Sequence, residues 1–484
     1  MLRLLLFCIV LSWAALSQAL TEVPRTLSLN DAILLALRES PGVQLQQLAA
    51  IQKKYALELA QWHFKPHYEI DASKLTSQTY SSTQAGGVSQ ITQNSTGITP
   101  KATLNTPFGT NITLAASNDI GKNYRPGVSL TVVQPLVRGF GRPIVEAALQ
   151  SAMESVKISH MQSEETLRNT VTNVIDAYLG VVSAEKTLEI DKGDLQRSQK
   201  SVDQTKLFIK AGRKAGVELV TVEAAVANIQ AKIETDQNSL AQAHAKLLQT
   251  IGLDPSANVV FTDISVPKLI QKYHIPSLED TKKLVVTNDV SYRTAQITYE
   301  GTVKRGVASA ENDMLWKLDL TATAATGSNG GSGSQNSGLN SLVNGVNRND
   351  SVTLNLTIPI DDQSAKIALE DAKIALHEAA IGLRQDKWKY ESTAIDSWNN
   401  VFSAERSLKL SGHAEELQQK VYNVNEQKYN YGLIDSIELQ NIRQTYMATQ
   451  QQYLSQQISY LRALVALDQL TGRTLQTWNI QVGS

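Results

Sequence analysis

The sequence contains two similar halves. In the first half, Ile175-Asp176 is followed a few residues later by Ser183-Ala184-Glu185. In the second half, Ile395-Asp396 is followed at the same spacing by Ser403-Ala404-Glu405. The two copies are 220 positions apart, and the same separation relates Gly212 to Gly432. One offset that persists over about 100 residues indicates duplication of a whole architectural unit, because a short repeat would recur more often. The chain should therefore fold as two copies of one structural unit.

We expect five segments from this duplication. They are a signal peptide (1–19), a first repeat (20–252), a linker (253–276), a second repeat (277–472) and a C-terminal tail (473–484). In the signal peptide, Arg3 precedes an apolar run that ends at Leu16 and is too short to span a bilayer. The only cysteine, Cys8, lies inside that run rather than at its end, which disfavours a lipoprotein signal. The mature chain would then lack disulfides, thiol catalysis and cysteine-based metal sites.

Each repeat should contain long helices. Ser28 and Ser277 are expected N-caps of the opening helices, and Pro41 should separate the first of these from a helix at about 43–63. From Pro143 to about Lys210 the chain has no further proline and shows an apolar stripe at helical spacing. Roughly 65 residues at 1.5 Å each predict a helix of about 100 Å. A break and a return helix should follow, and the second repeat should do the same; the ranges are 211–216 and 217–250, then 431–436 and 437–470.

Short alternating segments lie between the helices. Trp316–Ala324 and Val352–Ile358 alternate apolar and polar residues, and the first repeat has counterparts at Tyr68–Ser73 and Val128–Val132. Such alternation predicts strands with one face in an apolar medium. The segments 76–99 and 327–350 are rich in Gly, Ser, Asn and Gln and are expected to be solvated loops. Ala102–Ala116, with a Pro-Phe-Gly turn, is expected as an extra hairpin in the outer loop.

The alternation has two interpretations. It is commonly produced by a soluble antiparallel sheet, half buried. Beyond the signal segment no run of 18 apolar residues occurs, so a second way to cross a bilayer is a set of alternating strands of about 9–11 residues. Helices of about 100 Å beside so little strand favour the second interpretation. Four strands cannot close around a lumen, whereas three copies would supply twelve.

Taken together, the chain resembles the outer-membrane efflux proteins, the TolC family of trimeric channel-tunnels. The resemblance covers essentially the whole mature chain and rests on short motifs in a specific order. These are the helix opening Ser28–Ala32, the strand-to-helix junction Val133–Gly141 with its partner Thr357–Ile360, and the turn Tyr431–Leu433 with Ile437–Leu439. The family implies long antiparallel periplasmic helices forming an α-barrel, joined to a 12-stranded outer-membrane β-barrel to which each of three protomers gives four strands.

No catalytic constellation is found, and we expect no enzyme activity, cofactor or metal. His63 and His67 have helical ligand spacing, but Pro66 between them indicates a solvated junction. Gly139–Gly141 is half of a phosphate-loop pattern without the following Lys, and more simply turns the chain from strand to helix. Asp361 and Asp362 are more simply charges at a helix N-terminus than an acid/base pair.

The candidate functional residues lie at the two turns between long helices. The resemblance implies that these turns form the periplasmic tip, where the tunnel closes and an adaptor docks. Glu438 matches one position of a carboxylate ring that narrows the pore, and Asn441 holds an amide where some members have a second carboxylate. A plain helix-start charge is the other interpretation of Glu438. The full set is Gly212, Glu218, Leu219, Gly432, Glu438, Leu439 and Asn441.

The expected function is that of a passive outer-membrane exit duct in a tripartite efflux or type I secretion system. The partners would be two further copies of the chain, a periplasmic adaptor protein, an inner-membrane transporter and outer-membrane lipid. The formal net charge of −1 gives no reason to expect a nucleic-acid partner. The alternative is a secreted coiled-coil scaffold or adhesin without a pore.

Overall fold

The computed structural model describes residues 26–82, 88–121, 125–257, 259–262, 266–327 and 348–480. The predicted signal peptide lies outside these ranges. The chain divides into two compact units: a helical unit (1–47, 162–289 and 388–484) and a sheet unit (48–161 and 290–387). Among the described residues, no helix has the length and apolar character needed to cross a membrane.

The opening helices begin at the predicted caps. The Ser28 hydroxyl accepts a hydrogen bond from the backbone N–H of Asp31, and the Asp31 carboxylate accepts one from the backbone N–H of Ser28. This reciprocal capping satisfies two backbone donors at the start of α2 (Leu29–Glu39), and α3 (Pro41–Trp62) follows after Ser40. Ser277 caps α8 (Leu278–Asn288) through the N–H of Asp280. The predicted starts of both opening helices are confirmed.

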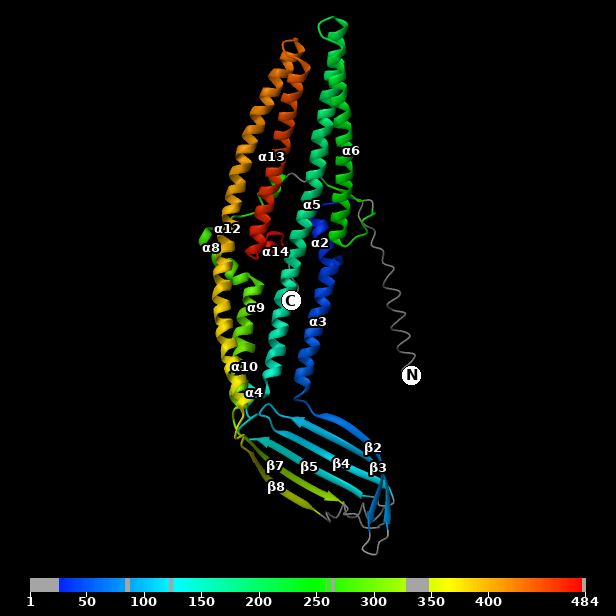
Figure 1. Cartoon of the computed structure of the whole chain (residues 1–484), viewed down its shortest axis with the longest axis vertical. Helices are drawn as coiled ribbons and strands as arrows, with labels where there is room; N and C mark the ends of the chain where they lie inside the picture. Colours follow the sequence, from blue (N-terminus) through cyan, green and yellow to red (C-terminus); the bar gives the residue numbers. More distant parts are fainter. Residues whose placement is uncertain are drawn as a thin grey trace. The chain divides into compact units, whose positions relative to one another are not determined.

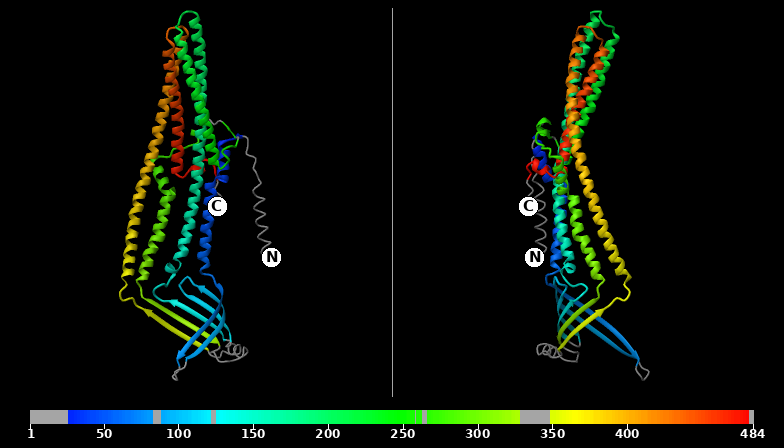
Figure 2. Two further views of the ribbon diagram at one scale, coloured as in Figure 1. Left: turned by 45° about the vertical axis from the view of Figure 1, so that its right-hand side comes forward. Right: turned by 90° about the vertical axis from the view of Figure 1, so that its left-hand side faces the viewer.

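Two long helical hairpins dominate the helical unit (Figure 1). α5 (Ala147–Lys210) and α12 (Gln363–Asn430) have 64 and 68 residues, and their return helices are α6 (Val217–Ile251) and α13 (Ser436–Leu470). The turning points are 220 positions apart, as the duplication predicts. The four-residue helix α4 (Arg142–Val145) precedes α5, so the predicted helix start near Pro143 is interrupted once at Glu146. The further views in Figure 2 show α6 and α13 side by side along the hairpins.

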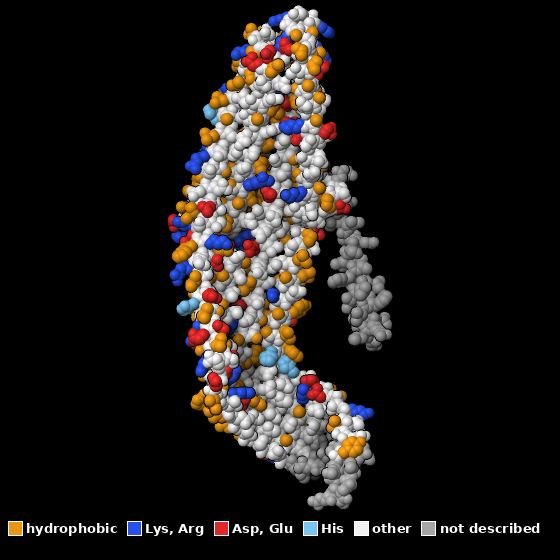
Figure 3. Space-filling model, viewed as in Figure 1, with side chains coloured by type: hydrophobic (Ala, Val, Ile, Leu, Met, Phe, Trp, Pro, Cys, Tyr) orange, Lys and Arg blue, Asp and Glu red, His pale blue; other side chains and the backbone are white. Residues whose placement is uncertain are grey.

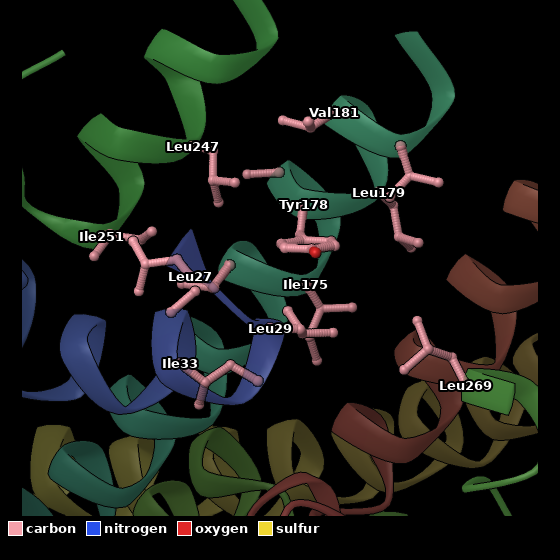
Figure 4. Packing of buried hydrophobic residues seen from close by; sticks show 14 of the residues in the cluster. Leu27, Leu29, Ile33, Ile175, Tyr178, Leu179, Val181, Leu247, Ile251 and Leu269 are labelled. Atoms are coloured by element: carbon pink, nitrogen blue, oxygen red, sulfur yellow. The ribbon is translucent and has the colours of Figure 1, made fainter. Parts of the chain in front are cut away.

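The core of the helical unit lies where α2, α5 and α6 meet (Figure 4). Tyr178 of α5 is 1% exposed and is surrounded by Leu27, Ile175 and Leu247, while its hydroxyl donates to the carbonyl of Thr262. Burying a large side chain of this kind contributes about 2–3 kcal/mol. The same region contains the parallel strand pair β1 (Thr26–Leu27) and β6 (Val260–Phe261) and the short helices α7 (Val266–Ile270) and α14 (Thr474–Thr477).

The second repeat enters the sheet unit through an interrupted helix. α9 (Val290–Thr298) and α10 (Lys304–Asp313) are joined by a π-helical turn, Tyr299–Val303. Gly301 lies on this turn, and a Cβ there would be 2.3 Å from the Glu154 carboxylate, which pairs with Arg305. The glycine therefore leaves space for a partly buried ion pair between α5 and α10.

Among the residues that the structure describes, the sheet unit contains six strands, not the four that we predicted. They form one antiparallel sheet in the order β2-β3-β4-β5-β7-β8. Their bounds are β2 (His67–Ser82), β3 (Val88–Asn105), β4 (Asn111–Gly121), β5 (Arg125–Pro135), β7 (Lys317–Gly327) and β8 (Asn349–Thr357). Long antiparallel helices with a small sheet are confirmed, whereas the prediction of four strands per protomer is wrong for the described residues.

Two loop predictions account for this difference. The segment 76–99 is largely strand, because β2 continues to Ser82 and β3 begins at Val88. The predicted hairpin Ala102–Ala116 exists, but its turn at 106–110 lies at the helix-proximal end of the sheet, not in an outer loop. Threonine and serine, frequent here, are compatible with strands although they also occur in loops. Most of the other predicted loop, 328–347, lies outside the described residues.

The register gives the sheet two unlike faces. Directly opposed residues of antiparallel strands share a face. One row runs across five strands through Leu104, Ile112, Val132, Ala322 and Val352. The adjacent row on the other face is Thr103, Thr113, Thr131, Thr323 and Ser351. In Figure 3 the visible surface of the sheet is mostly white, with few apolar or charged side chains. The sheet is therefore apolar on one side and lined by hydroxyl groups on the other.

Candidate functional site at the hairpin turns

The two hairpin turns have the same backbone geometry. Gly212 and Gly432 have φ values of 68° and 74°, in the left-handed region that favours glycine. In each turn this glycine donates its N–H to a carbonyl three residues earlier, and the next residue donates to a carbonyl five residues earlier. Such paired bonds satisfy carbonyls at a helix C-terminus. The predicted duplication of the turn is thus present in atomic detail.

A glutamate at the first turn links the two hairpins. The Glu218 carboxylate accepts a hydrogen bond of 2.9 Å from the Ser436 hydroxyl and one of 2.9 Å from Lys214. Ser436 is 1% exposed and is the first residue of α13. Burial alone would raise the pKa of Glu218, but the hydrogen bonds from Lys214 and Ser436 outweigh it and lower the pKa below its ordinary value. Glu218 is therefore ionised at neutral pH, as its contact with Lys214 requires.

Aromatic contacts complete the connection below the turns. The buried Tyr429 hydroxyl is 2.7 Å from the Thr205 hydroxyl, and its ring meets Phe208 edge-on at 5.8 Å. The Lys214 ammonium lies 4.5 Å from the centre of the Tyr429 ring. Arg213 donates to the carbonyl of Tyr431 at 3.2 Å. Each of these contacts joins the first hairpin to the second, so the turns are held together as one structure.

The remaining predicted residues divide into buried and exposed groups. Leu439 is buried in a cluster with Tyr422, Tyr429 and Tyr446, and Leu219 is half-buried. Glu438 and Asn441 are exposed on the first two turns of α13. The backbone N–H of Glu438 donates to the Asp435 carboxylate, which caps the helix. The structure thus brings Glu218 to the second hairpin and leaves Glu438 and Asn441 facing solvent.

A buried polar cluster joins α5, α6 and α13 and was not predicted. Asp191, Asp194 and Arg443 are all more than nine-tenths buried. Asp191 pairs with Lys232 of α6 at 2.9 Å, and Arg443 Nε lies 3.1 Å from the Asp194 carboxylate. The cluster borders a pocket of about 280 Å³. Arg443 follows Leu439 by one helical turn and precedes Tyr446, so its position on an otherwise apolar stripe was a usable sequence signal.

Two carboxyl groups of this cluster titrate unusually. Burial raises the pKa of Asp194, although Arg443 opposes the shift. Burial and a hydrogen bond to Asp191 raise the pKa of Asp236 on α6 to about 6. Asp236 therefore gains a proton more readily in the folded chain than in the unfolded chain.

Asp236→Asn is expected to change the pH dependence of stability. A raised pKa means that the carboxylate destabilises the fold increasingly as the pH rises from about 4 through 6. The variant removes this effect, so its Tm in detergent should exceed that of the wild type at pH 8 and match it near pH 4. Glu234→Gln, an exposed neighbour on α6, is the matched control. Equal Tm differences at both pH values would contradict the assignment.

This arrangement of duplicated helices and a sheet agrees with the protein family that the sequence matches. The sequence model of the family described as "Outer membrane efflux protein" matches residues 35–253 and 287–473. The chain belongs to the outer membrane efflux protein family. The resemblance seen in the sequence, and the outer-membrane location that it implied, are thereby confirmed.

Solved structures of membrane channels share the fold. A CusC structure superposes with a TM-score of 0.70 at 14% identity, covering 92% of this chain and 91% of that one. CmeC of Campylobacter jejuni gives 0.67 at 14% identity, with 92% and 86% covered. MtrE of Neisseria gonorrhoeae gives 0.66 at 14% identity, with 93% and 90% covered. Among curated protein sequences, none matches. Membership of this family favours a channel over a scaffold without a pore.

Proposed function

We propose that three copies of this efflux-family chain form a passive exit duct through the outer membrane. The observation that carries the proposal is the sheet with one apolar face and two open edges, β2 and β8. In lipid an open edge leaves backbone donors and acceptors unpaired, at several kcal/mol for each group. Closure with neighbouring copies removes both edges and directs the apolar face to lipid.

Exposed apolar stripes on two helices support assembly. On α12, four large side chains recur every seven residues and are between 52% and 61% exposed: Ile367, Ile374, Ile381 and Trp388. On α3, a second stripe follows helical spacing: Leu45, Leu48, Ile51, Tyr55, Leu59 and Trp62. Seven-residue apolar repeats are typical of helices that pack along one another. A neighbouring protomer would cover both stripes.

The duct would receive its substrate from a periplasmic adaptor and an inner-membrane pump, which supply the energy. The hairpin turns are the proposed periplasmic end, and the contacts from Glu218 to Ser436 would keep the two hairpins of a protomer together there. Glu438 and Asn441 are the proposed pore-facing residues. We also propose that residues 20–252 and 277–472 act as the two structural repeats, with 253–276 as linker and 473–484 as tail.

Detergent extraction and mass measurement test this function. The protein should leave outer membranes only with detergent, remain trimeric in it and conduct ions in planar bilayers. The double variant Ile374→Asp/Ile381→Asp should weaken the trimer, because it introduces charges into the stripe. The double variant Ala368→Asp/Ala375→Asp, at exposed positions about 100° away around the same helix, should not. A stable folded monomer, or release from membranes by salt alone, would favour the scaffold interpretation.

A further inference from the structure

The hairpin of β3 and β4 is an integral part of the sheet. β4 pairs with β5 over nine residue pairs, from Asn111↔Val133 to Asp119↔Arg125, and β3 pairs with β2 over sixteen. The apolar face continues through it, because Tyr68, Ala102, Leu114 and Leu130 are successive members of one row. If this hairpin lay in a solvated outer loop, its apolar residues would not need to align with the apolar face of the sheet.

The turn of this hairpin is fixed at the helix-proximal end. Gly109 has φ 95°, and a Cβ there would be 2.7 Å from the carbonyl oxygen of Gly139 and 3.1 Å from the Pro135 ring. The carbonyl of Phe108 accepts a hydrogen bond from the N–H of Gly141. The turn therefore packs directly on the junction that leads from β5 to α4.

Side chains on both sides of the turn strengthen this attachment. The Arg142 guanidinium lies 5.3 Å from the centre of the Phe108 ring. Asn111 donates to the side chain of Asn105 at 2.7 Å, and Asn105 donates to the carbonyl of His63, the residue after α3. On the polar face Lys101 of β3 pairs with both Glu69 and Asp71 of β2. These contacts hold β2, β3 and β4 in the same sheet as β5.

We propose that the six strands of each of three protomers close one 18-stranded barrel, which gives the duct a wide outer end for bulky hydrated solutes. This rests on the trimeric duct proposed above. β2 runs away from the helices and β8 returns, so β8 of one protomer and β2 of the next are antiparallel, as closure requires. Barrel diameter grows about linearly with strand number, so the barrel is about 1.5 times as wide as one of twelve strands at equal tilt.

The width has a consequence for selection. A lumen with about twice the cross-section, lined by threonine and serine, offers hydration without a specific binding site. Barrels of 16–18 strands already leave a water-filled channel. The narrow end at the hairpin turns, rather than the barrel, then limits the size of the solutes. Solutes too large for a twelve-stranded barrel can cross the outer membrane through the wider one.

Disulfide cross-linking tests which strand forms the edge. The only cysteine, Cys8, lies in the predicted signal peptide, so single cysteines can be placed on the polar face of each edge strand: Glu69, Asp71 or Ser73 of β2, and Ser351, Thr353 or Asn355 of β8. Pairs between β2 and β8 should give covalent trimers, because strand neighbours reach disulfide distance. Cross-linking of β8 to Thr113→Cys of β4 in a neighbouring copy would overturn the proposal, since β2 and β3 would then lie outside a twelve-stranded barrel.

Channel measurements test the width. Deleting residues 88–121 removes β3 and β4 while preserving strand direction, since β2 still runs outward and β5 inward. Expected are a roughly twofold fall in conductance and a smaller exclusion limit for polyethylene glycols in the deletion variant. If the deletion variant had the same conductance and exclusion limit as the wild type, the 18-stranded barrel would be wrong. If the variant fails to assemble, the cross-links decide between the two barrels. If the wild-type protein formed no trimer in detergent, the proposed function itself would be refuted.

Discussion

Replacing Glu438 with lysine is expected to reverse the ion preference of the channel. Glu438 is exposed in the first turn of α13, beside the turn of the second hairpin. If three protomers converge at this end, three carboxylates surround one axis and attract cations into a narrow passage. Glu438→Gln should reduce cation preference, and Glu438→Lys should bring the cation-to-anion permeability ratio from above one to below one.

Reversal potentials in a salt gradient measure this ratio. Glu234→Lys makes the same change of charge at an exposed position in the middle of α6, away from the turns, and should leave the ratio near that of the wild type. The Tm of both Glu438 variants should stay close to the wild-type value, because the side chain is exposed. An unaltered ratio in Glu438→Lys would show that this residue is only a helix-start charge.

The helical part of the fold could be predicted from the sequence because its signals are local. These signals are a capping serine, a proline-free apolar stripe and a glycine in the left-handed region. Each acts over a few residues and occurs in both repeats. Ser28, Gly212 and Gly432 therefore occupy the places expected of them.

The strand count could not be predicted in the same way. In the outer halves of β2 and β3 both faces carry Thr, Ser, Gln or Asn, so the alternation that marks a strand disappears. Only pairing with a neighbour of known register places such residues in a sheet. The separation between the opening and long helices is 29 residues greater in the first repeat, and this was the available sign of two additional strands.

The buried polar cluster depends on three helices at once. Asp191 and Asp194 on α5, Lys232 on α6 and Arg443 on α13 have no local relation in the sequence. Charged residues on a long helix are mostly solvated, so a sequence of this kind gives no reason to pair them. The pairing emerges when the apolar stripes bring the hairpins together.

Arg443→Met is expected to destabilise the helical unit by about 3 kcal/mol or more. Arg443 is 5% exposed, and its removal leaves the buried Asp194 with the more distant Arg197, whose Nε is 4.0 Å away. Because burial already raises the pKa of Asp194, the variant should lose most at pH 8 and recover as the pH falls and the carboxyl protonates. Thermal unfolding in detergent at several pH values measures both effects.

Two controls separate the loss of a buried partner from the loss of a charge. Lys420→Met breaks an ion pair with Glu416 that is exposed on both sides, and should cost less than about 1 kcal/mol. The double variant Arg443→Met/Asp194→Leu removes both buried charges and should recover most of the stability, because no unpaired carboxylate remains. If Arg443→Met were as mild as Lys420→Met, the ion pair would contribute little. If the double variant did not recover, packing by the arginine stem rather than its charge would stabilise the three helices.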